Sequence, residues 1–324
     1  MNNKPTTKTA DIIIPIYIPD TKFDRLIGGL LTQTRLPGRI ILMVTEKGEA
    51  TAEALRARVE ELTQAHPIPG SGRIEIIIRG LSEQDYDHGA TRHLGSTYSD
   101  ADYLIYMTQD ACPADSHLLE NLLLPFSDPD VTAVYARQLP DKTDGEIETY
   151  THEFNYPPES RKKTKADIPT LGIKTYFCSN VCAAYRHDIY QELGGFVRHT
   201  IFNEDMLMAA AMINAGHAVY YAAEAKVYHS HQYTAKQQFK RNFDLGVSHR
   251  QYAEVFGTVK SESEGIRLVK NTARHLIRKN KLSELPKLFV HSACKYAGYL
   301  LGTHYDKLPK KMIKACSLCR HYWK

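Results

Sequence analysis

The chain has 324 residues, of which 43% are hydrophobic and 24% charged, and its formal net charge is +4. This composition is that of a globular protein and allows one large domain or two smaller ones. Met1 to Thr9 are polar and lack the apolar core of a signal peptide, and no apolar stretch reaches the roughly 18 residues of a membrane-spanning helix. We therefore expect a protein that is kept in the cytoplasm.

Strands and helices alternate through the first 110 residues. The predicted strands are 11–17, 39–44, 73–79 and 103–107, and the predicted helices are 21–34, 50–64 and 89–100. Buried strands that alternate with helices predict an α/β fold with a mostly parallel, doubly wound sheet and helices on both faces. Ligands of such sheets bind at the carboxyl ends of the strands.

The pattern loosens after Asp110. Further predicted helices are 116–126 and 204–215, and further predicted strands are 131–137, 176–185 and 219–228. Residues 140–172 are polar and rich in proline and lysine, which predicts a long surface loop. The chain beyond Phe256 is helical and basic. We therefore expect one domain at residues 10–255 and a helical C-terminal extension at residues 256–324.

A single carboxylate, Asp110, follows the fourth predicted strand. Mg²⁺ and Mn²⁺ are often held by one or two carboxylates together with substrate phosphates. His229 and His231 follow the last predicted strand, and their alternate spacing puts them on one side of an extended segment. One of them could complete a metal site or contact a phosphate. A helix cap at Asp110 and packed or surface imidazoles are the alternatives.

A second acidic cluster, Glu204 and Asp205, opens a predicted helix. A carboxylate near an activated sugar can remove the proton of an acceptor hydroxyl. With Asp110 holding a metal and a diphosphate, the two clusters indicate sugar transfer from a nucleotide donor. The alternative is that both carboxylates only stabilise the start of the helix.

A third group of polar residues, Tyr86 to Arg92, lies between the third predicted strand and a helix, where ligands bind. Gly89 allows close approach of a backbone, and Arg92 could pair with a diphosphate. An ordinary junction between loop and helix is the alternative.

Taken together, these residues resemble family-2 glycosyltransferases of the GT-A fold, and more narrowly the bacterial rhamnosyltransferase branch that builds surface polysaccharides. No single motif is specific, but their order from about Ala10 to Arg250 is. The matching pieces are Ile12–Pro15, Asp87–Arg92, Met107–Ala111, Arg137–Pro140, Phe154–Pro157, Ser179–Asn180, Gly194–Phe196, Glu204–Asp205 and His229–His231.

The resemblance implies an inverting transfer from a nucleotide sugar, with Mg²⁺ or Mn²⁺ bridging the diphosphate. Asp110 matches the last aspartate of the DxD signature, whose first position is Thr108 here. Asp205 matches the catalytic base, with Glu204 beside it. The expected metal ligands are Asp110, His229 and His231, and the expected donor contacts are Pro15, Tyr17, Glu46, Asp87, His88, Gly89, Arg92 and Gln109. Glu46 stands where the family normally has an aspartate pair that reads the base and ribose.

The donor favoured by the resemblance is dTDP-L-rhamnose, with a UDP-sugar as the second choice. The expected acceptor is a hydroxyl of a lipid-linked or growing surface polysaccharide. A sugar-1-phosphate nucleotidyltransferase would normally carry a glycine-rich loop with arginine after the first strand, where this chain has Pro15–Asp20. A non-catalytic scaffold that binds nucleotide sugars is a further alternative, against which the intact Glu204–Asp205 pair speaks.

The C-terminal residues 261–324 contain 14 Lys and Arg against 4 Asp and Glu. Basic and apolar residues alternate there, which is typical of helices at an anionic membrane surface. Helices that pack on the catalytic body with a solvated basic face are the alternative. Nucleic acid is not an expected partner, because no recognition motif accompanies the charge. We expect a peripheral protein on the inner face of the plasma membrane.

Overall fold

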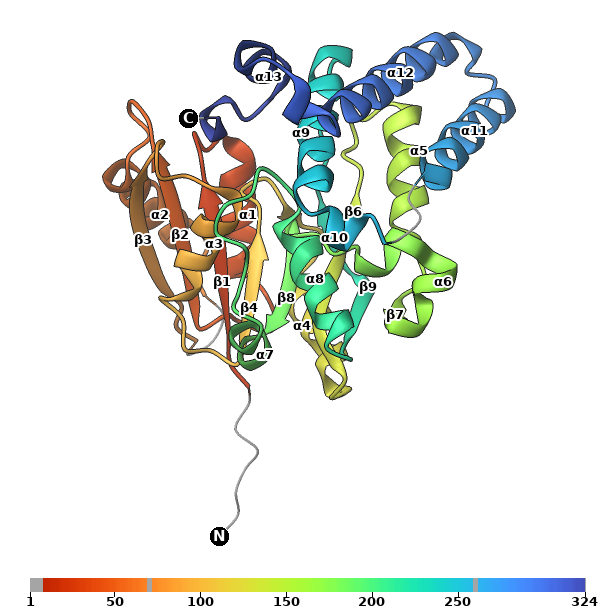
Figure 1. The fold of residues 1–324 in the computed structure, drawn as a ribbon. Coiled ribbons are helices and arrows are strands. Elements are labelled where there is room, and N and C mark those ends of the chain that lie inside the picture. Colours follow the sequence, from red (N-terminus) through yellow and green to blue (C-terminus); the bar gives the residue numbers. More distant parts are fainter. Residues whose placement is uncertain (1–7, 69–71, 259–261, 324) are drawn as a thin grey trace.

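The computed structural model describes residues 8–68, 72–258 and 262–323. Its strands form one sheet in the order β3-β2-β1-β4-β8-β6-β9-β5, and β7 pairs with β9 (Figure 1). The strands are β1 Ala10–Ile16, β2 Arg39–Glu46, β3 Glu75–Ser82, β4 Tyr103–Met107, β5 Cys112–Pro113, β6 Val131–Leu139, β7 Arg161–Lys163, β8 Cys182–Arg186 and β9 Ala218–Tyr228.

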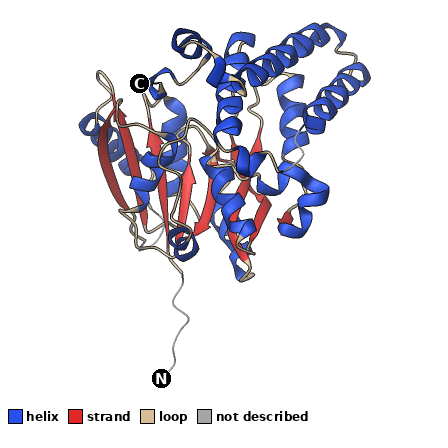
Figure 2. Cartoon of the chain, in the orientation of Figure 1, coloured by secondary structure: helices blue, strands red, loops and turns tan. Residues whose placement is uncertain are grey.

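Helices cover both faces of the sheet, and a group of helices near the C-terminus lies at one end of it (Figure 2). The helices are α1 Thr21–Leu31, α2 Ala52–Ala65, α3 His88–Ser96, α4 Leu118–Leu123, α5 Glu146–Asn155, α6 Ile168–Leu171, α7 His187–Glu192, α8 Glu204–Asn214, α9 Ala235–Gln251, α10 Ala253–Phe256, α11 Glu262–Arg278, α12 Leu285–Gly302 and α13 Lys310–Cys316.

Strand β1 shows why the first half of the chain folds as predicted. Successive side chains of a strand point to opposite faces of a sheet. Ile12 and Ile14 therefore join the apolar cluster under α1, α2 and α4, whereas Ile13 joins the cluster under α7 and α8. Each strand and helix predicted before residue 107 is present within a few residues of its expected ends. The predicted α/β fold is confirmed.

The second half of the sheet is mixed. Strands β1, β2, β3 and β4 are parallel, as expected, but β8 runs antiparallel between β4 and β6. Because β8 is buried on both sides, its apolar run reads like that of a parallel strand. Strand direction depends on the path of the chain between residues 140 and 181, which the sequence pattern does not reveal.

Residues 140–172 are not the long loop that their composition predicts. They contain α5, β7 and α6. Helix α5 buries only Ile147 fully, and two of its glutamates pair with later residues: Glu146 with His275 at 3.0 Å and Glu148 with Lys287 at 3.0 Å. These partners lie more than 120 residues away, so the sequence alone did not indicate them. The strand predicted at 176–185 is also shorter, because β8 begins at Cys182.

The C-terminal helices pack on α9 above the edge of the sheet at which β1 ends (Figure 1). Phe243 and Val247 of α9 share an apolar cluster with Ile313 of α13. Helix α9 thus lies within the predicted first domain, but it is packed against the predicted extension. Within the described residues, no helix combines the length and apolarity needed to cross a bilayer.

Helices α9 and α12 approach so closely that glycine is required between them. A Cβ atom at Gly298 of α12 would overlap the carbonyl oxygen of Phe239, and one at Gly302 would overlap that of Phe243. We predict that Gly298→Ala lowers the free energy of unfolding by about 1–3 kcal/mol, because the helices must move apart. Urea denaturation measures the change.

Gly265 of α11 supplies the matched control, because a Cβ there would meet no atom within 4 Å. Alanine is the better helix former by about 1 kcal/mol, so Gly265→Ala leaves stability unchanged or raises it. Equal stability of Gly298→Ala and the parent protein would contradict the close contact.

Candidate active site

Three residues that could bind a metal meet at the carboxyl ends of β4 and β9. Strand β5 pairs with the end of β9, which brings Asp110 next to the histidines that follow Tyr228. The Nε2 atoms of His229 and His231 lie 3.6 and 3.3 Å from the carboxylate oxygens of Asp110. One potential ligand atom from each residue lies within 4.8 Å of the other two. The structure thus brings together all three predicted metal ligands.

Gln138 at the end of β6 orients His229. Its Oε1 atom lies 3.0 Å from Nδ1 of His229, and its Nε2 atom donates to Oγ of Ser179 at 3.0 Å. Because the amide oxygen can only accept, Nδ1 of His229 carries the proton and Nε2 is free to bind a cation. Burial lowers the pKa of His229 to about 3 and also lowers the pKa of His231. Both imidazoles are neutral at physiological pH, as metal ligands must be.

The two acidic residues at the start of α8, Glu204 and Asp205, lie in different environments. Glu204 is buried and pairs with Arg92, with Nη1 to Oε1 at 3.2 Å, and it also accepts a hydrogen bond from Nδ2 of Asn180. Burial by itself would raise the pKa of Glu204, but the facing guanidinium holds the pKa below its usual value. Glu204 is therefore an ionised partner of Arg92.

Asp205 is partly exposed and has no cationic side chain as an ion-pair partner among the described residues. Its two oxygens accept the backbone N–H groups of Asn180 at 3.0 Å and of Met206 at 2.8 Å. Burial, followed by the negative charge of Glu204, raises the pKa of Asp205 to about 7. A carboxylate with this pKa can both take and release a proton near neutral pH.

A short chain of contacts joins the metal-binding cluster to the acidic pair. It runs from His229 through Gln138 to Ser179, and the next residue, Asn180, contacts both Glu204 and Asp205. Gln138 and Ser179–Asn180 were noted in the sequence as motifs but were given no role. These residues link the candidate metal ligands to the acidic pair through hydrogen bonds.

The predicted donor contacts on α3 lie beneath the acidic pair and hold its loop in place. Asp87 caps α3 by accepting the N–H groups of Gly89 and Ala90, and its other oxygen accepts the N–H of Thr200. A Cβ atom at Gly89 would overlap the carbonyl oxygen of Val197. These contacts fasten the segment 196–203, which leads into α8, to the start of α3.

Two further predicted donor contacts, His88 and Arg92, are also directed into the protein. His88 lies against Tyr86 and within 3.8 Å of Sγ of Cys319, and burial lowers its pKa to about 4. Arg92 is only 5% exposed and faces Glu204. The diphosphate contact predicted for Arg92 does not agree with this position, because the guanidinium is already paired. The sequence did not show that its neighbour in space is Glu204.

The remaining predicted donor contacts lie along the carboxyl ends of β1, β2 and β4. The backbone of Tyr17 and the side chain of Gln109 exchange two hydrogen bonds, of 2.7 and 2.8 Å, which tie the ends of β1 and β4 together. The ring of Tyr17 is 43% exposed. Pro15 lies within β1, and Glu46 ends β2 and accepts the N–H of Ala52.

Two basic residues near the metal-binding cluster were missed from the sequence. The guanidinium of Arg241 on α9 lies 4.7 Å from the ring centre of Phe202 and 5.6 Å from that of Tyr233. Nζ of Lys22 lies 3.5 Å from the carbonyl oxygen of Ser230. Neither cation has a carboxylate partner in the described parts of the chain, so both are available to an anion. In the sequence, Lys22 follows the Pro15–Asp20 segment and Arg241 follows the His229–His231 motif. This nearness to predicted site residues could have indicated both cations.

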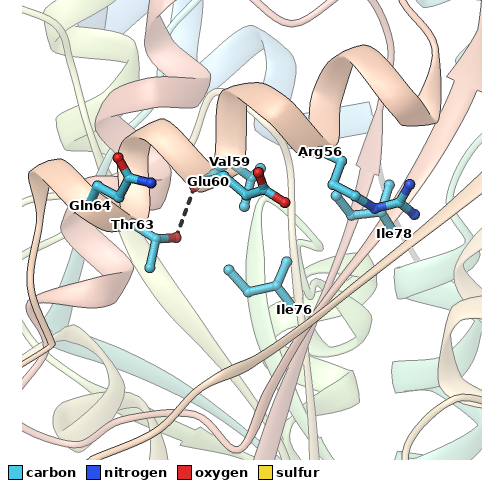
Figure 3. A pocket seen from close by; sticks show the side chains of 7 residues that line it. All are labelled: Arg56, Val59, Glu60, Thr63, Gln64, Ile76 and Ile78. Atoms are coloured by element: carbon cyan, nitrogen blue, oxygen red, sulfur yellow. Dashed lines mark hydrogen bonds between the residues drawn. The ribbon is translucent and has the colours of Figure 1, made fainter.

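A shallow depression between α2 and β3 contains none of the predicted site residues. It is lined by Arg56, Val59, Glu60, Thr63, Gln64, Ile76 and Ile78 (Figure 3). It lies at the outer strand of the sheet, and the polar residues of the site lie at the strand ends. We therefore place the candidate active site at the strand ends.

An α/β sheet with three candidate metal ligands and an acidic pair at its carboxyl edge is the architecture of a GT-A glycosyltransferase. The model of the family "Glycosyl transferase family 2" matches residues 11–194. The chain therefore belongs to glycosyl transferase family 2, and it is a glycosyltransferase.

The chain is similar to two curated relatives over almost its whole length. It is 38% identical to O-antigen chain rhamnosyltransferase RfbN of Salmonella typhimurium and 35% identical to O-antigen chain rhamnosyltransferase WbaN of Salmonella anatum. Each alignment covers 96% of this chain and 95% of the relative.

Solved structures share the fold at low sequence identity. Mannosyltransferase PcManGT from Pyrobaculum calidifontis, in complex with GDP-Man and Mn²⁺, is 16% identical, with a TM-score of 0.56 over 98% of this chain and 86% of that chain. TarS 1–349 of S. aureus in complex with UDP-GlcNAc is 11% identical, with a TM-score of 0.51 over 92% of this chain and 91% of that chain.

We predict that Asp110→Asn weakens Mn²⁺ binding at least about tenfold, because it removes the only carboxylate of the cluster. His229→Ala has a similar effect. Calorimetric titration of Mn²⁺ measures both, with the exposed Glu53→Gln on α2 as a control that leaves binding unchanged. Undiminished Mn²⁺ affinity in both site variants would refute the metal site.

Proposed function

We propose that this enzyme transfers L-rhamnose, with inversion, from dTDP-L-rhamnose to a hydroxyl of a lipid-linked or growing surface polysaccharide. The similarity to two proteins named O-antigen chain rhamnosyltransferases, over 95% of each, is the observation that carries the proposal. A UDP-sugar is the second donor candidate.

In this proposal, Asp205 is the catalytic base. The acceptor oxygen attacks the anomeric carbon of the donor, and its proton moves to the Asp205 carboxylate. The bond between the anomeric carbon and the diphosphate oxygen breaks, and the nucleoside diphosphate leaves with the electron pair. The backbone N–H groups of Asn180 and Met206 support this role, because they hold both carboxylate oxygens in a fixed plane.

We assign different roles to the other members of the predicted site. Glu204 and Arg92 position Asp205 and tune its pKa, and neither contacts the substrate. Arg241 and Lys22 contact the donor diphosphate, a role consistent with two cations that lack carboxylate partners in the described chain. Pro15, Tyr17, Glu46 and Gln109 line the nucleoside end of the site, while Asp87, His88 and Gly89 hold its framework.

We assign the metal site to Asp110, His229 and His231. Their bound cation would supply positive charge that stabilises the departing diphosphate. Imidazole suits the harder Mg²⁺ poorly, so a set of two imidazoles and one carboxylate favours Mn²⁺. The structural relative in complex with GDP-Man contains Mn²⁺, which supports the same choice.

We propose that the protein acts in the cytoplasm, on the inner face of the plasma membrane. This location follows from the proposed acceptor, because a lipid-linked glycan is confined to the membrane. The nucleotide donor is a soluble molecule and reaches the enzyme from the cytoplasm.

We predict that Asp205→Asn lowers kcat about a hundred- to ten-thousandfold and leaves donor affinity unchanged, since the amide cannot accept the proton. In the parent enzyme, protonation removes the base, so activity rises with pH and reaches half its plateau near pH 7. Steady-state transfer rates across pH measure both effects. The exposed Asp188→Asn on α7 serves as the control.

An Asp205→Asn enzyme with parental kcat would show that another group is the base. A pH profile whose midpoint stays near pH 4 would show that Asp205 keeps the pKa of an ordinary carboxylate.

The donor assignment is tested by calorimetry with dTDP-rhamnose, UDP-sugars and GDP-sugars, each with and without Mn²⁺. We expect Mn²⁺-dependent binding of dTDP-rhamnose, weakened at least about tenfold by Arg241→Ala. Preference for a UDP-sugar would keep the mechanism and discard the rhamnosyl donor. Absence of binding to every nucleotide sugar would contradict the proposed function.

A further inference from the structure

Large apolar side chains on the protein surface are concentrated on the C-terminal helices. Of the fourteen that are exposed in the described chain, nine lie between residues 266 and 318. These nine are Ile266, Ile277, Leu282, Phe289, Val290, Tyr296, Leu300, Met312 and Leu318. Exposed apolar groups gathered on one part of a surface commonly mark an interaction site.

Helix α12 has an inner face that packs on other helices and an outer face that is exposed. The inner face packs on α9 through Gly298 and Gly302, and the buried Leu288 packs with Ile147 of α5 and Leu276 of α11. The outer face carries Phe289 and Tyr296, which are 56% and 69% exposed, and Leu300 lies one turn further on. Their spacing of seven and four residues places all three on one side of a helix. Packing on α9 therefore does not account for them.

Exposed lysines lie in the segments that precede and follow α12. Lys279 and Lys281 lie in the turn before α12, and Lys310, Lys311 and Lys314 lie on α13. The three lysines of α13 form no ion pair in the described part of the chain, whereas Lys279 and Lys281 act electrostatically on Glu146 of α5. Apolar side chains bordered by exposed lysines match a lipid surface in which acyl chains lie beneath anionic headgroups.

We infer that the outer face of α12, flanked by the lysines of α13 and of the turn before α12, docks on an anionic lipid bilayer. The charge decides between the candidate partners. Residues 261–324 carry a balance of +10, so two copies that met through this face would bring like charges together. A polyanion such as nucleic acid would leave Phe289, Tyr296 and Leu300 without apolar contacts.

Docking in this way would also orient the active site. Helix α12 packs on α9, and α9 carries Arg241 beside the metal-binding cluster. Because α12 packs closely on α9, the bilayer would hold the site at a fixed height above the lipid headgroups. This consequence rests on the proposed lipid-linked acceptor, whereas the docking itself does not.

Flotation of the full chain with lipid vesicles tests the inference. One vesicle type contains phosphatidylglycerol and phosphatidylcholine in equal parts, and the other contains phosphatidylcholine alone. We expect the parent protein to float with the anionic vesicles only. The triple variant Phe289→Ser, Tyr296→Ser and Leu300→Ser should bind them at least about tenfold more weakly, because it removes the apolar contacts.

The triple variant Lys310→Gln, Lys311→Gln and Lys314→Gln should also bind at least about tenfold more weakly. Leu124→Ser is the matched control: Leu124 is 67% exposed but lies after α4, away from the C-terminal helices, and its loss should not change flotation. Melting temperatures and donor binding are measured in parallel, because surface changes should leave both unaltered.

Failure of the parent protein to float, or equal flotation of all variants, would overturn the inference. Sedimentation velocity measures whether the parent protein forms a dimer. A dimer that is lost in the variant with Phe289, Tyr296 and Leu300 changed would assign the face to a second copy of the chain. Donor binding reports on the proposed function separately, so a protein that binds dTDP-rhamnose but no vesicle would refute the docking surface alone.

Discussion

The buried ion pair between Arg92 and Glu204 is the interaction on which the active site depends. Removing one partner of such a pair leaves an uncompensated charge in the interior, at a typical cost of about 3–5 kcal/mol. The pair joins α3 to the start of α8, and it occupies Glu204 so that Asp205 alone faces the accessible side. The negative charge of Glu204 also helps to raise the pKa of Asp205 to about 7. One contact therefore positions the proposed base and adjusts its proton affinity.

The residues just before α8 are held in place by several hydrogen bonds. Asn203 adopts a left-handed backbone conformation with φ of 68°, and its side chain donates to Oγ of Ser248 on α9. Ser248 in turn donates to the carbonyl oxygen of Phe202. Strained conformations of this kind persist only where neighbouring contacts maintain them. The acidic pair is thus fixed from below by α3 and from the other side by α9.

The residues that follow α13 contact both α9 and the segment that leads into α8. Asp244 of α9 accepts the N–H groups of Leu318 and Cys319, and Tyr322 stacks on His199 at 4.6 Å between ring centres. The last residues of the described chain are thereby held against the segment 196–203 that leads to α8. Helix α9, on which they pack, carries Arg241, and α12 presents the exposed apolar face.

The sequence by itself determined the first half of the sheet and indicated that Asp110 and one of the two histidines, His229 or His231, could share a site. Both follow from local rules: buried strands have continuous apolar runs, and side chains that follow strands gather at one edge of a sheet. It also identified Glu204 and Asp205 as a pair. The resemblance assigned the base to Asp205, although two adjacent carboxylates carry the same local signal. The tertiary structure adds a physical difference between them, by placing Arg92 opposite Glu204. Only the tertiary structure also revealed the direction of β8, the helix α5 within the expected loop and the position of Arg241. Each of these depends on contacts between segments far apart in the chain.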